Sequence, residues 1–317
     1  MLNTKTPSCH PAWIGVDVGK ESLVAYIAAT GETQTIDNKR TAIISFLRGC
    51  AGASLVLEAT GGYEAVLIEA AIKAGHTVYR VNARRVRAFM ESVGIYAKTD
   101  AIDAKALADY AAANAQRLRP FALPCPIMKE LRQCARRRDE LVVLRTQETN
   151  RLQAPDNVLL RPSIKAVLEC LDRQIDEMER RIQLLVETTP LLQKKLGVLT
   201  AVKGVGFVTA VNLLVAMPEL GELDRKQVAA LAGLAPFPRD SGKRKGYRRT
   251  RGGRVEVRRA LYMAALSASR YNEDLKIFYN RLIDNGKKPL QAIIATARKL
   301  LVILNAKLRD AALNQTV

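Results

Sequence analysis

The order of short apolar runs between residues 13 and 82 constrains the fold of this chain more strongly than any other feature of its sequence. Runs of strand length alternate with longer segments in which apolar residues recur every three or four positions, as on one face of a helix. This order predicts a mixed sheet flanked by helices. The expected strands are 13–17, 22–29, 33–36, 54–57 and 77–81, and the expected helices are 41–47, 63–73 and 101–116.

A cluster of prolines marks the end of this α/β part. Pro120, Pro124 and Pro126 interrupt regular structure, so we place a domain boundary among them. The predicted fold class is α/β plus all-α: an α/β domain with the element order of ribonuclease-H-like folds, then helical segments. The predicted domains are 1–122, 123–190 and 191–317.

The middle segment contains a strict heptad pattern of apolar residues. An antiparallel helical hairpin, an oligomerising coiled coil and a seam packed on its own domain all remain compatible with this pattern. The seam residues are Ile164, Leu168, Leu171, Ile175, Met178, Ile182 and Leu185.

The charge of the chain indicates its partners. The 317 residues include 50 Lys and Arg against 31 Asp and Glu, a formal net charge of +19. Such an excess predicts a polyanionic partner, with nucleic acid ahead of an anionic membrane. No run approaches the roughly 20 apolar residues of a transmembrane helix. The N-terminal residues do not resemble a signal peptide, so we expect a cytoplasmic protein without membrane contact.

Cysteine and histidine restrict the possible chemistry. The five cysteines are scattered and form no CxxC pair, which predicts reduced thiols and excludes a zinc finger. The two histidines are His10 and His76, so the C-terminal two-thirds of the chain contain no histidine base.

Four carboxylates occupy positions that such a sheet would bring together. Asp17 ends the first expected strand and Glu58 the fourth, while Asp100 and Asp103 lie three residues apart at a helix start and share one face. Clustered carboxylates repel each other unless a cation compensates, and Mg²⁺ or Mn²⁺ prefers oxygen ligands. Two such ions could hold the attacking and leaving oxygens of a phosphodiester. Each residue alone could instead be a surface or helix-cap charge.

Two segments of the last third indicate phosphate binding. Gly204 and Gly206 flank Val205 in a turn like that of a helix-hairpin-helix motif, although a plain helix connection is also compatible. Ser241 follows a Pro-rich stretch and precedes a basic run that suits a nucleic-acid backbone. A loop serine is commonly only a turn residue, and it needs activation to act as a nucleophile. The cations are Lys243, Arg244, Lys245, Arg248, Arg249, Arg251, Arg254, Arg258 and Arg259.

One other fold opens with a strand, an Asp-x-Gly turn and a hairpin. Sugar-kinase and actin-like ATPases repeat this unit in a second domain. In this chain Asp240 and Gly242 match the letters, but they follow Pro236 and Pro238 and run into the basic segment. We therefore reject the ATPase interpretation.

Together these motifs resemble the DEDD insertion-sequence transposases, which are relatives of the Piv and MooV invertases. The resemblance rests on GVDVGK with Asp17, LEATGGYE with Glu58, KTDAIDAKALA with Asp100 and Asp103, the GVG turn, and LAGLAPFPRDSG followed by RRALYMAAL. It implies a RuvC-like domain that binds Mg²⁺ through the four carboxylates, a coiled-coil insert and a transposase domain. It further implies that Ser241 is the nucleophile and forms a phosphoserine link to DNA.

From these observations we expect a site-specific DNA recombinase of a mobile element. The resemblance implies double-stranded DNA as substrate, a bridge RNA as guide, and a dimer that becomes a tetramer on nucleic acid with a composite active site. Two other functions remain open. A junction-resolving nuclease would use only the metal site, and a non-catalytic nucleic-acid-binding protein would use only the charge.

Overall fold

The computed structural model describes residues 12–313 except 239, 241, 243–245 and 247. The chain divides into two compact units, Met1–Leu123 and Pro124–Val317. Unit 1 is α/β, and unit 2 is almost entirely helical in its described part. The predicted combination of an α/β part with an all-α part is therefore confirmed, and the first unit is consistent with a ribonuclease-H-like domain.

Unit 1 is built on a five-stranded mixed sheet with the order β3-β2-β1-β4-β5. The central strand β1 pairs antiparallel with β2 and parallel with β4. The first three strands are connected as hairpins, whereas β4 and β5 are parallel and joined through a helix. The strands are β1 (Trp13–Val18), β2 (Ser22–Ile27), β3 (Glu32–Asp37), β4 (Ser54–Glu58) and β5 (Thr77–Val81).

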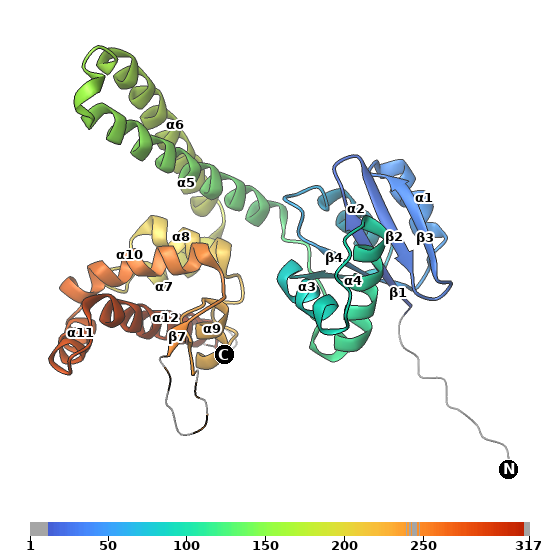
Figure 1. Cartoon of the computed structure of the whole chain (residues 1–317). Helices are drawn as coiled ribbons and strands as arrows, with labels where there is room; N and C mark the ends of the chain where they lie inside the picture. The colour runs from blue at the N-terminus through green and yellow to red at the C-terminus, as the bar shows by residue number, and fades with distance from the viewer. Residues whose placement is uncertain (1–11, 239, 241, 243–245, 247, 314–317) are drawn as a thin grey trace. The chain divides into compact units, whose positions relative to one another are not determined.

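Helices cover both faces of this sheet (Figure 1). Alternate residues of each strand point to opposite faces, so one apolar strand can serve two cores. Ile14 and Val16 belong to the core shared with α1 and α2, whereas Trp13 and Val56 belong to the core shared with α3 and α4. The helices are α1 (Arg40–Arg48), α2 (Ala65–Lys73), α3 (Ala83–Ser92) and α4 (Asp100–Asn114).

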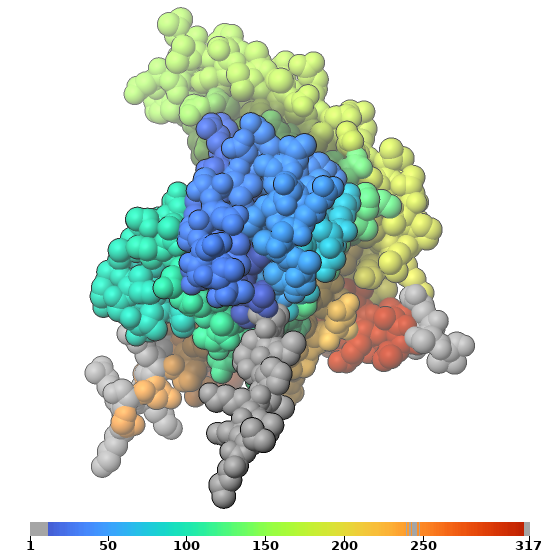
Figure 2. Space-filling model, turned by 90° about the vertical axis from the view of Figure 1, so that its right-hand side faces the viewer, coloured from blue at the N-terminus to red at the C-terminus, as the bar shows by residue number. Residues whose placement is uncertain are grey.

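One edge of the sheet is polar and exposed. All but one of the β3 residues are exposed, and Ile36 is the partly buried exception that packs on the α1 side. Polar edge strands discourage pairing with other chains. Figure 2 shows the surface of unit 1, on which exposed residues of the first hairpins and of α1 are blue.

The closest backbone approach in unit 1 lies between β1 and α4. A Cβ atom placed on Gly15 would lie 1.9 Å from the carbonyl oxygen of Ala104 and 2.7 Å from the backbone nitrogen of Ala108. Both are backbone atoms, which cannot move aside as the end of a side chain can. Only glycine at this position lets α4, a helix rich in alanine, lie directly on the central strand.

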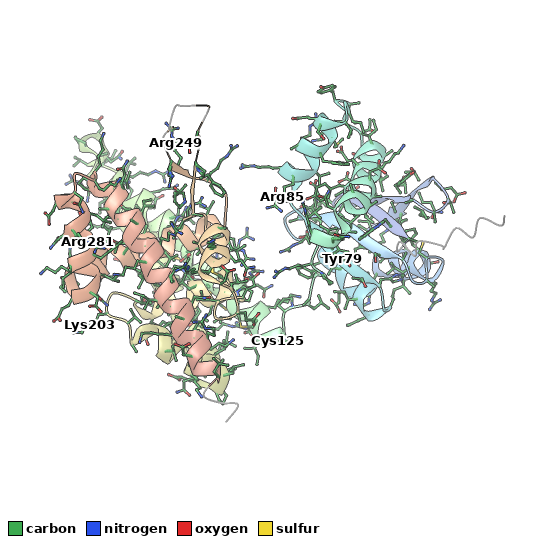
Figure 3. All side chains as sticks on the ribbon, turned by 90° about the horizontal axis from the view of Figure 1, so that it is seen from below. Tyr79, Arg85, Cys125, Lys203, Arg249 and Arg281 are labelled. Atoms are coloured by element: carbon green, nitrogen blue, oxygen red, sulfur yellow. The ribbon has the colours of Figure 1, made fainter. Side chains whose placement is uncertain are left out.

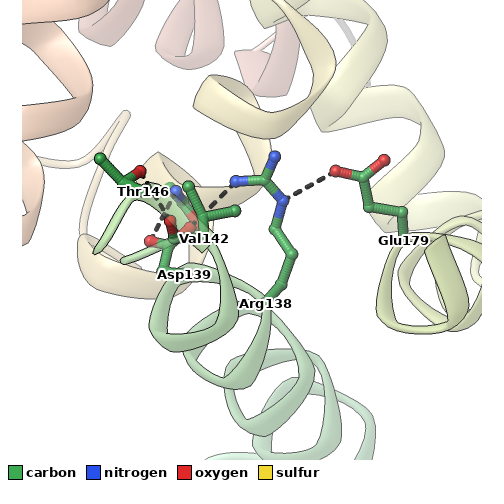
Figure 4. Close-up of polar contacts among 6 residues, drawn as sticks. Arg138, Asp139, Val142, Thr146 and Glu179 are labelled. Carbon is green, nitrogen blue, oxygen red and sulfur yellow. Dashed lines mark hydrogen bonds and ion pairs between the residues drawn. The ribbon is translucent and has the colours of Figure 1, made fainter. Parts of the chain in front are cut away.

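Unit 2 begins with two long helices, α5 (Pro126–Gln153) and α6 (Arg161–Glu187), which form an antiparallel hairpin. Ile164, Ile175 and Ile182 of the heptad seam are buried. In Figure 4, Arg138 of α5 donates to Glu179 of α6 at 2.8 Å and to the neighbouring Asp139 at 3.2 Å. Of the interpretations that the heptad left open, the helical hairpin is the one observed in the chain.

The rest of unit 2 packs around a central helix. The sequence predicts no membrane-spanning helix, yet α12 is long and apolar enough by length and composition to be a candidate. Its apolar residues pack into the main core of the unit, and its buried Asn305 is fully engaged, accepting from Gly221 at 2.9 Å and donating to Leu223 at 2.7 Å. A helix buried in the core of a protein can have the same length and apolar composition as a membrane-spanning helix. The remaining helices are α7 (Pro190–Thr200), α8 (Phe207–Ala216), α9 (Arg225–Leu231), α10 (Val255–Tyr271), α11 (Glu273–Asp284) and α12 (Pro289–Leu313).

A two-residue ribbon interrupts this helical unit. Strand β6 (Pro236–Phe237) pairs antiparallel with β7 (Arg249–Thr250). The ribbon brackets the segment that carries Ser241, so the two ends of this segment are held together. Helix α10 begins at Val255, so Arg258 and Arg259, the last arginines of the basic run, belong to a helix.

The contact between β1 and α4 generates a stability prediction. Gly15→Ala should destabilise unit 1 by about 3 kcal/mol or more, because the added methyl group meets backbone atoms in a close-packed layer. Urea unfolding followed by tryptophan fluorescence measures this effect, since Trp13, the single tryptophan of the chain, is buried in unit 1.

Gly49→Ala is the matched control. Gly49 ends α1 with a φ of −74°, and its nearest atom to an added Cβ is 3.4 Å away. This variant should unfold within about 0.5 kcal/mol of the parent protein. Equal unfolding midpoints for the two variants would contradict the close approach.

Candidate active site

The register of the two central strands places two of the predicted carboxylates side by side. Val16 of β1 pairs with Leu57 of β4, so Asp17 and Glu58 follow at neighbouring positions where the parallel strands end. Both have the same strand parity as Gly15 and Val56, and therefore point to the face that α4 covers. Each is half-buried.

The N-terminus of α4 brings the other two carboxylates to this edge. Thr99 caps the helix: its hydroxyl accepts from the backbone N–H of Ile102 at 3.3 Å, and its carbonyl accepts from that of Asp103 at 2.8 Å. Asp100 and Asp103 lie in the first turn of the helix. Asp100 lies one turn before Ala104, the residue that meets Gly15, and Asp103 lies directly before it, so the packing that requires glycine also carries the acidic turn toward Asp17.

The electrostatics of unit 1 show that the carboxylates interact. Burial raises the pKa of Asp17, and the charges of Asp100 and Asp103 raise it further. Burial also raises the pKa of Glu58, and the charges of Asp17 and Asp103 add to this effect. Lys98, in the segment before α4, lowers both pKa values in part. The structure thus brings the four predicted residues into one electrostatic cluster.

The donor set fits a hard divalent cation by its chemistry. All four side chains offer oxygen atoms, and their mutual repulsion is the kind that Mg²⁺ or Mn²⁺ relieves. Among the described residues, no group of three or more His, Cys, Asp or Glu side chains is arranged to hold a metal ion. Binding of an ion therefore requires the carboxylates to turn toward a common point.

The loop that follows Glu58 is held by a carboxylate to which the sequence assigns no role. Glu64 is 6% exposed and accepts from the backbone N–H of Gly62 at 2.8 Å, and from the N–H and hydroxyl of Thr60 at 3.2 and 3.0 Å. Burial alone would raise its pKa, but these hydrogen bonds lower it below the ordinary value. In the sequence, the pair Gly61 and Gly62 shortly before α2 is the signal that indicates this hydrogen-bonded loop.

Asn38 joins the loops that follow strands β1 and β4. Its side-chain nitrogen donates to the carbonyl of Gly19, two residues after Asp17, at 2.9 Å, and to that of Tyr63 at 3.1 Å. These bonds fix the ends of β1 and β4 relative to each other. Nothing in the local pattern of the sequence indicates this bridge. His76, by contrast, is buried and bonded to the carbonyl of Ala53 at 3.0 Å, which is a structural role.

In unit 2 the predicted glycine turn lies between α7 and α8. Gly204 has a φ of +102°, and a Cβ on it would lie 2.6 Å from Cα of Ala268 in α10. Gly206 is the N-cap of α8 and has no atom within 4 Å of an added Cβ. The first glycine is therefore required by packing, and the second leaves the start of α8 open. Figure 3 shows Lys203 of this turn and Arg249 of β7 on unit 2.

Ser241, Lys243, Arg244 and Lys245 lie outside the described residues. Of their described neighbours, Asp240 accepts from the backbone N–H of Gly246 at 2.9 Å. Their predicted roles stay predictions.

The described arginines of the basic run fall into two groups. Arg248, Arg249, Arg251 and Arg259 are exposed. Arg254 donates to both carboxylate oxygens of Glu219 at 2.7 Å and to the carbonyl of Ala216, and Arg258 donates to the carbonyl of Gly252. The second group holds the start of α10 in place, which leaves the first group as the better candidates for phosphate contacts.

Comparison with known proteins identifies the family. A transposase family model matches residues 14–159, and a model described as the transposase IS116/IS110/IS902 family matches residues 197–280. A pilin gene-inverting protein of Moraxella bovis is 30% identical over 94% of this chain and 96% of its own length. The chain belongs to this transposase family.

Two other relatives of this transposase support the same family assignment. The pilin gene-inverting protein of Moraxella lacunata is 29% identical over the same shares of both chains. An uncharacterised protein of insertion element IS110 from Streptomyces coelicolor is 32% identical over 47% of this chain and 36% of its own length. The predicted family and the predicted activity of a DNA transposase or recombinase are confirmed.

The raised pKa values of the transposase site predict a pH dependence of stability. Because Asp17 and Glu58 hold protons more tightly in the folded state, stability should fall as pH rises through and above their ordinary values of 3.8 and 4.5. In buffer with a chelator, Asp17→Asn should therefore melt higher than the parent at neutral pH, and this difference should vanish toward pH 4. Thermal melts of unit 1 across this pH range measure it.

Glu21→Gln is the control, because Glu21 is exposed in the turn after β1 and outside the carboxylate cluster. It should leave the dependence on pH unchanged. A lower melting temperature for Asp17→Asn at neutral pH would show that the carboxylate is stabilised by its surroundings rather than repelled.

Proposed function

We propose that this transposase cuts and rejoins DNA at sites specified by a guide RNA, with Ser241 as nucleophile and Mg²⁺ at the carboxylate cluster. The observation that carries the proposal is the electrostatic cluster of Asp17, Glu58, Asp100 and Asp103 at one edge of the sheet. A cluster of four carboxylates at one edge of the sheet, in a protein with a net charge of +19, supports a site for a cation that acts on a phosphate.

The four carboxylates would hold Mg²⁺ or Mn²⁺. When bound, the ion supplies charge stabilisation at the phosphate and lowers the pKa of a coordinated hydroxyl. Glu64 and Asn38 are positioning residues in this proposal, because they fix the loops on which Glu58 and Asp17 end. Lys98 offsets part of the negative charge near the cluster.

The serine step exchanges one phosphodiester bond for another. The hydroxyl of Ser241 loses its proton as its oxygen forms a bond to phosphorus, the bond from phosphorus to the adjoining sugar oxygen breaks, and that oxygen takes up a proton, so no net proton is gained or lost. The resulting phosphoserine is again a phosphodiester, so a sugar hydroxyl of another strand can reverse the step and rejoin DNA without a further energy source. The exposed arginines of β7 and its flanks would stabilise negative charge on the phosphate.

We assign three parts to this reaction: a RuvC-like domain at 1–122, a coiled-coil segment at 123–190 and a transposase domain at 191–317. The composite site that the family resemblance implies joins the carboxylates of one protomer to Ser241 of another. We therefore propose a dimer that becomes a tetramer on double-stranded DNA and RNA, in the bacterial cytosol.

The proposed nucleophile predicts a covalent adduct. The protein is incubated with the DNA ends of its element, guide RNA and Mg²⁺, and then denatured. A protein–DNA adduct should remain on a denaturing gel with the parent protein and disappear with Ser241→Ala. Asp17→Asn should also give no adduct while binding DNA as the parent does, because the lost carboxylate acts on the transition state more than on binding.

An adduct with Ser241→Ala would place the nucleophile elsewhere. Nicked DNA without any adduct would support a metal-dependent, junction-resolving nuclease instead. DNA binding without cleavage by the parent protein under all metal conditions would support a non-catalytic nucleic-acid-binding protein.

The exposed arginines predict the salt dependence of binding. Replacing Arg248, Arg249 and Arg251 by Gln should flatten the slope of log K against log salt by about 2 to 3 units, since each phosphate contact contributes about 0.9. The loss should be similar for cognate and random DNA, because backbone contacts do not read sequence. Fluorescence anisotropy between about 50 and 200 mM salt measures the slope.

The matched control replaces Arg136, Arg151 and Arg180 by Gln. Each of these arginines has a carboxylate partner on its own helix: Glu140, Glu148 and Glu177, respectively. Their charges are already balanced, so the slope should change by less than about 1 unit. Equal slopes for the two triple variants would mean that net charge, and not the β7 region, sets DNA affinity.

A further inference from the structure

A groove of about 750 Å³ lies in unit 2 between the β6–β7 ribbon and helices α11 and α12. One side of the groove is formed by the β6–β7 ribbon, which brackets the Ser241 segment. The opposite side is formed by the end of α11 and the first three turns of α12. This volume is in the range of sites for small molecules or single nucleotides and is too small for a duplex.

The groove combines an alkyl floor with a cationic rim. Leu282, Leu290 and Ile294 contribute the apolar surface, whereas the rim has Arg248, Arg249, Lys287 and Arg298, and none of the described lining residues is acidic. Other arginines of unit 2, such as Arg138 and Arg254, have carboxylate partners, but no ion pair is observed for these four cations within the described residues. Four unpaired cations around one cavity repel each other, so an anionic ligand would stabilise the arrangement.

The two surfaces together specify the occupant. If an apolar helix occupied the groove, the four cations would be removed from water without a partner. If a phosphate ion alone occupied it, the alkyl side chains would stay exposed to water. A nucleotide satisfies both, because its phosphate binds Arg or Lys and its base covers apolar surface. The floor has no aromatic side chain among its described residues, so contact with a base is alkyl in kind, as for the methyl group of thymine.

We propose that this groove seats one unpaired nucleotide of the DNA strand that passes the Ser241 segment. The inference rests on the proposed function, since the strand attacked by the serine is DNA and the groove is built from the ribbon that holds the serine segment. Removing one base from the stack next to the reacting phosphodiester would fix the register of the strand at low energetic cost where the duplex is already opened.

The test measures binding without cleavage. In the Ser241→Ala background, fluorescence anisotropy compares a DNA duplex with one bulged thymidine, the same duplex with an abasic bulge and a fully paired duplex. The thymidine bulge should bind about tenfold more tightly than the other two, because its base buries apolar surface against the alkyl side chains. Ala295→Trp, which fills the groove, should remove this preference and leave binding of paired duplex unchanged.

Three further variants accompany this comparison. Ala295→Ser changes the same position without filling the groove and should retain the preference. Arg298→Gln removes a cation that would bind the phosphate, which both bulges carry, so it should weaken binding of both bulged duplexes without adding bulk. Lys307→Gln removes an exposed cation further along α12, outside the groove, and should not change the preference for the thymidine bulge.

Equal affinity for all three duplexes, or a preference that survives Ala295→Trp, would overturn the proposal. An equal or stronger preference for the same bulge in RNA would assign the groove to RNA, and competition by vesicles of anionic phospholipid would assign it to a lipid. Either result contradicts the DNA assignment. Because the assay needs no cleavage, it can fail while the parent protein still forms the serine adduct, so the two proposals are judged separately.

Discussion

The direct contact between Gly15 of β1 and the backbone of α4 is the interaction on which unit 1 depends. An added Cβ would lie 1.9 Å from the carbonyl oxygen of Ala104, so the helix lies on the strand without any side chain between them. Asp17 is two residues further along the same face of the strand, and Asp103 precedes Ala104 at the start of the helix. A larger separation of these elements would leave the acidic turn of α4 too far from Asp17 and Glu58 to act with them.

The acidic cluster is assembled against its own repulsion. Burial and neighbouring charges both raise the pKa values of Asp17 and Glu58, so the folded chain holds these groups together at a cost to its stability. The apolar packing on both faces of the sheet offsets that cost, and the hydrogen bonds of Glu64 and Asn38 fix the two loops. Perturbed pKa values of this kind cluster at the functional sites of proteins.

The arginines of unit 2 differ in whether they have a carboxylate partner. Arg138 and Arg254 serve the fold, because each has a carboxylate within hydrogen-bonding distance. Arg248 and Arg249 are exposed at the ribbon beside the Ser241 segment. A basic run in the sequence therefore contains two physical classes of residue, and only the class without carboxylate partners can contribute fully to binding of a polyanion.

The sequence by itself determined the five strands of unit 1, its helices α1, α2 and α4 and the positions of its carboxylates, because apolar periodicity and strand ends are local properties of the chain. Helix α3 was not among the expected elements. The sequence also determined the sign of the charge and hence the kind of partner. The tertiary structure decided that α5 and α6 pair within one chain, that Arg254 binds Glu219 and that Glu64 holds the loop after Glu58. The first two are contacts between residues far apart in sequence, and the third depends on burial of a carboxylate, which periodicity does not encode. The carboxylates follow the same rule. The sequence places Asp17 and Glu58 at the ends of strands, but the parallel register of β1 and β4, which is a long-range contact, puts them side by side.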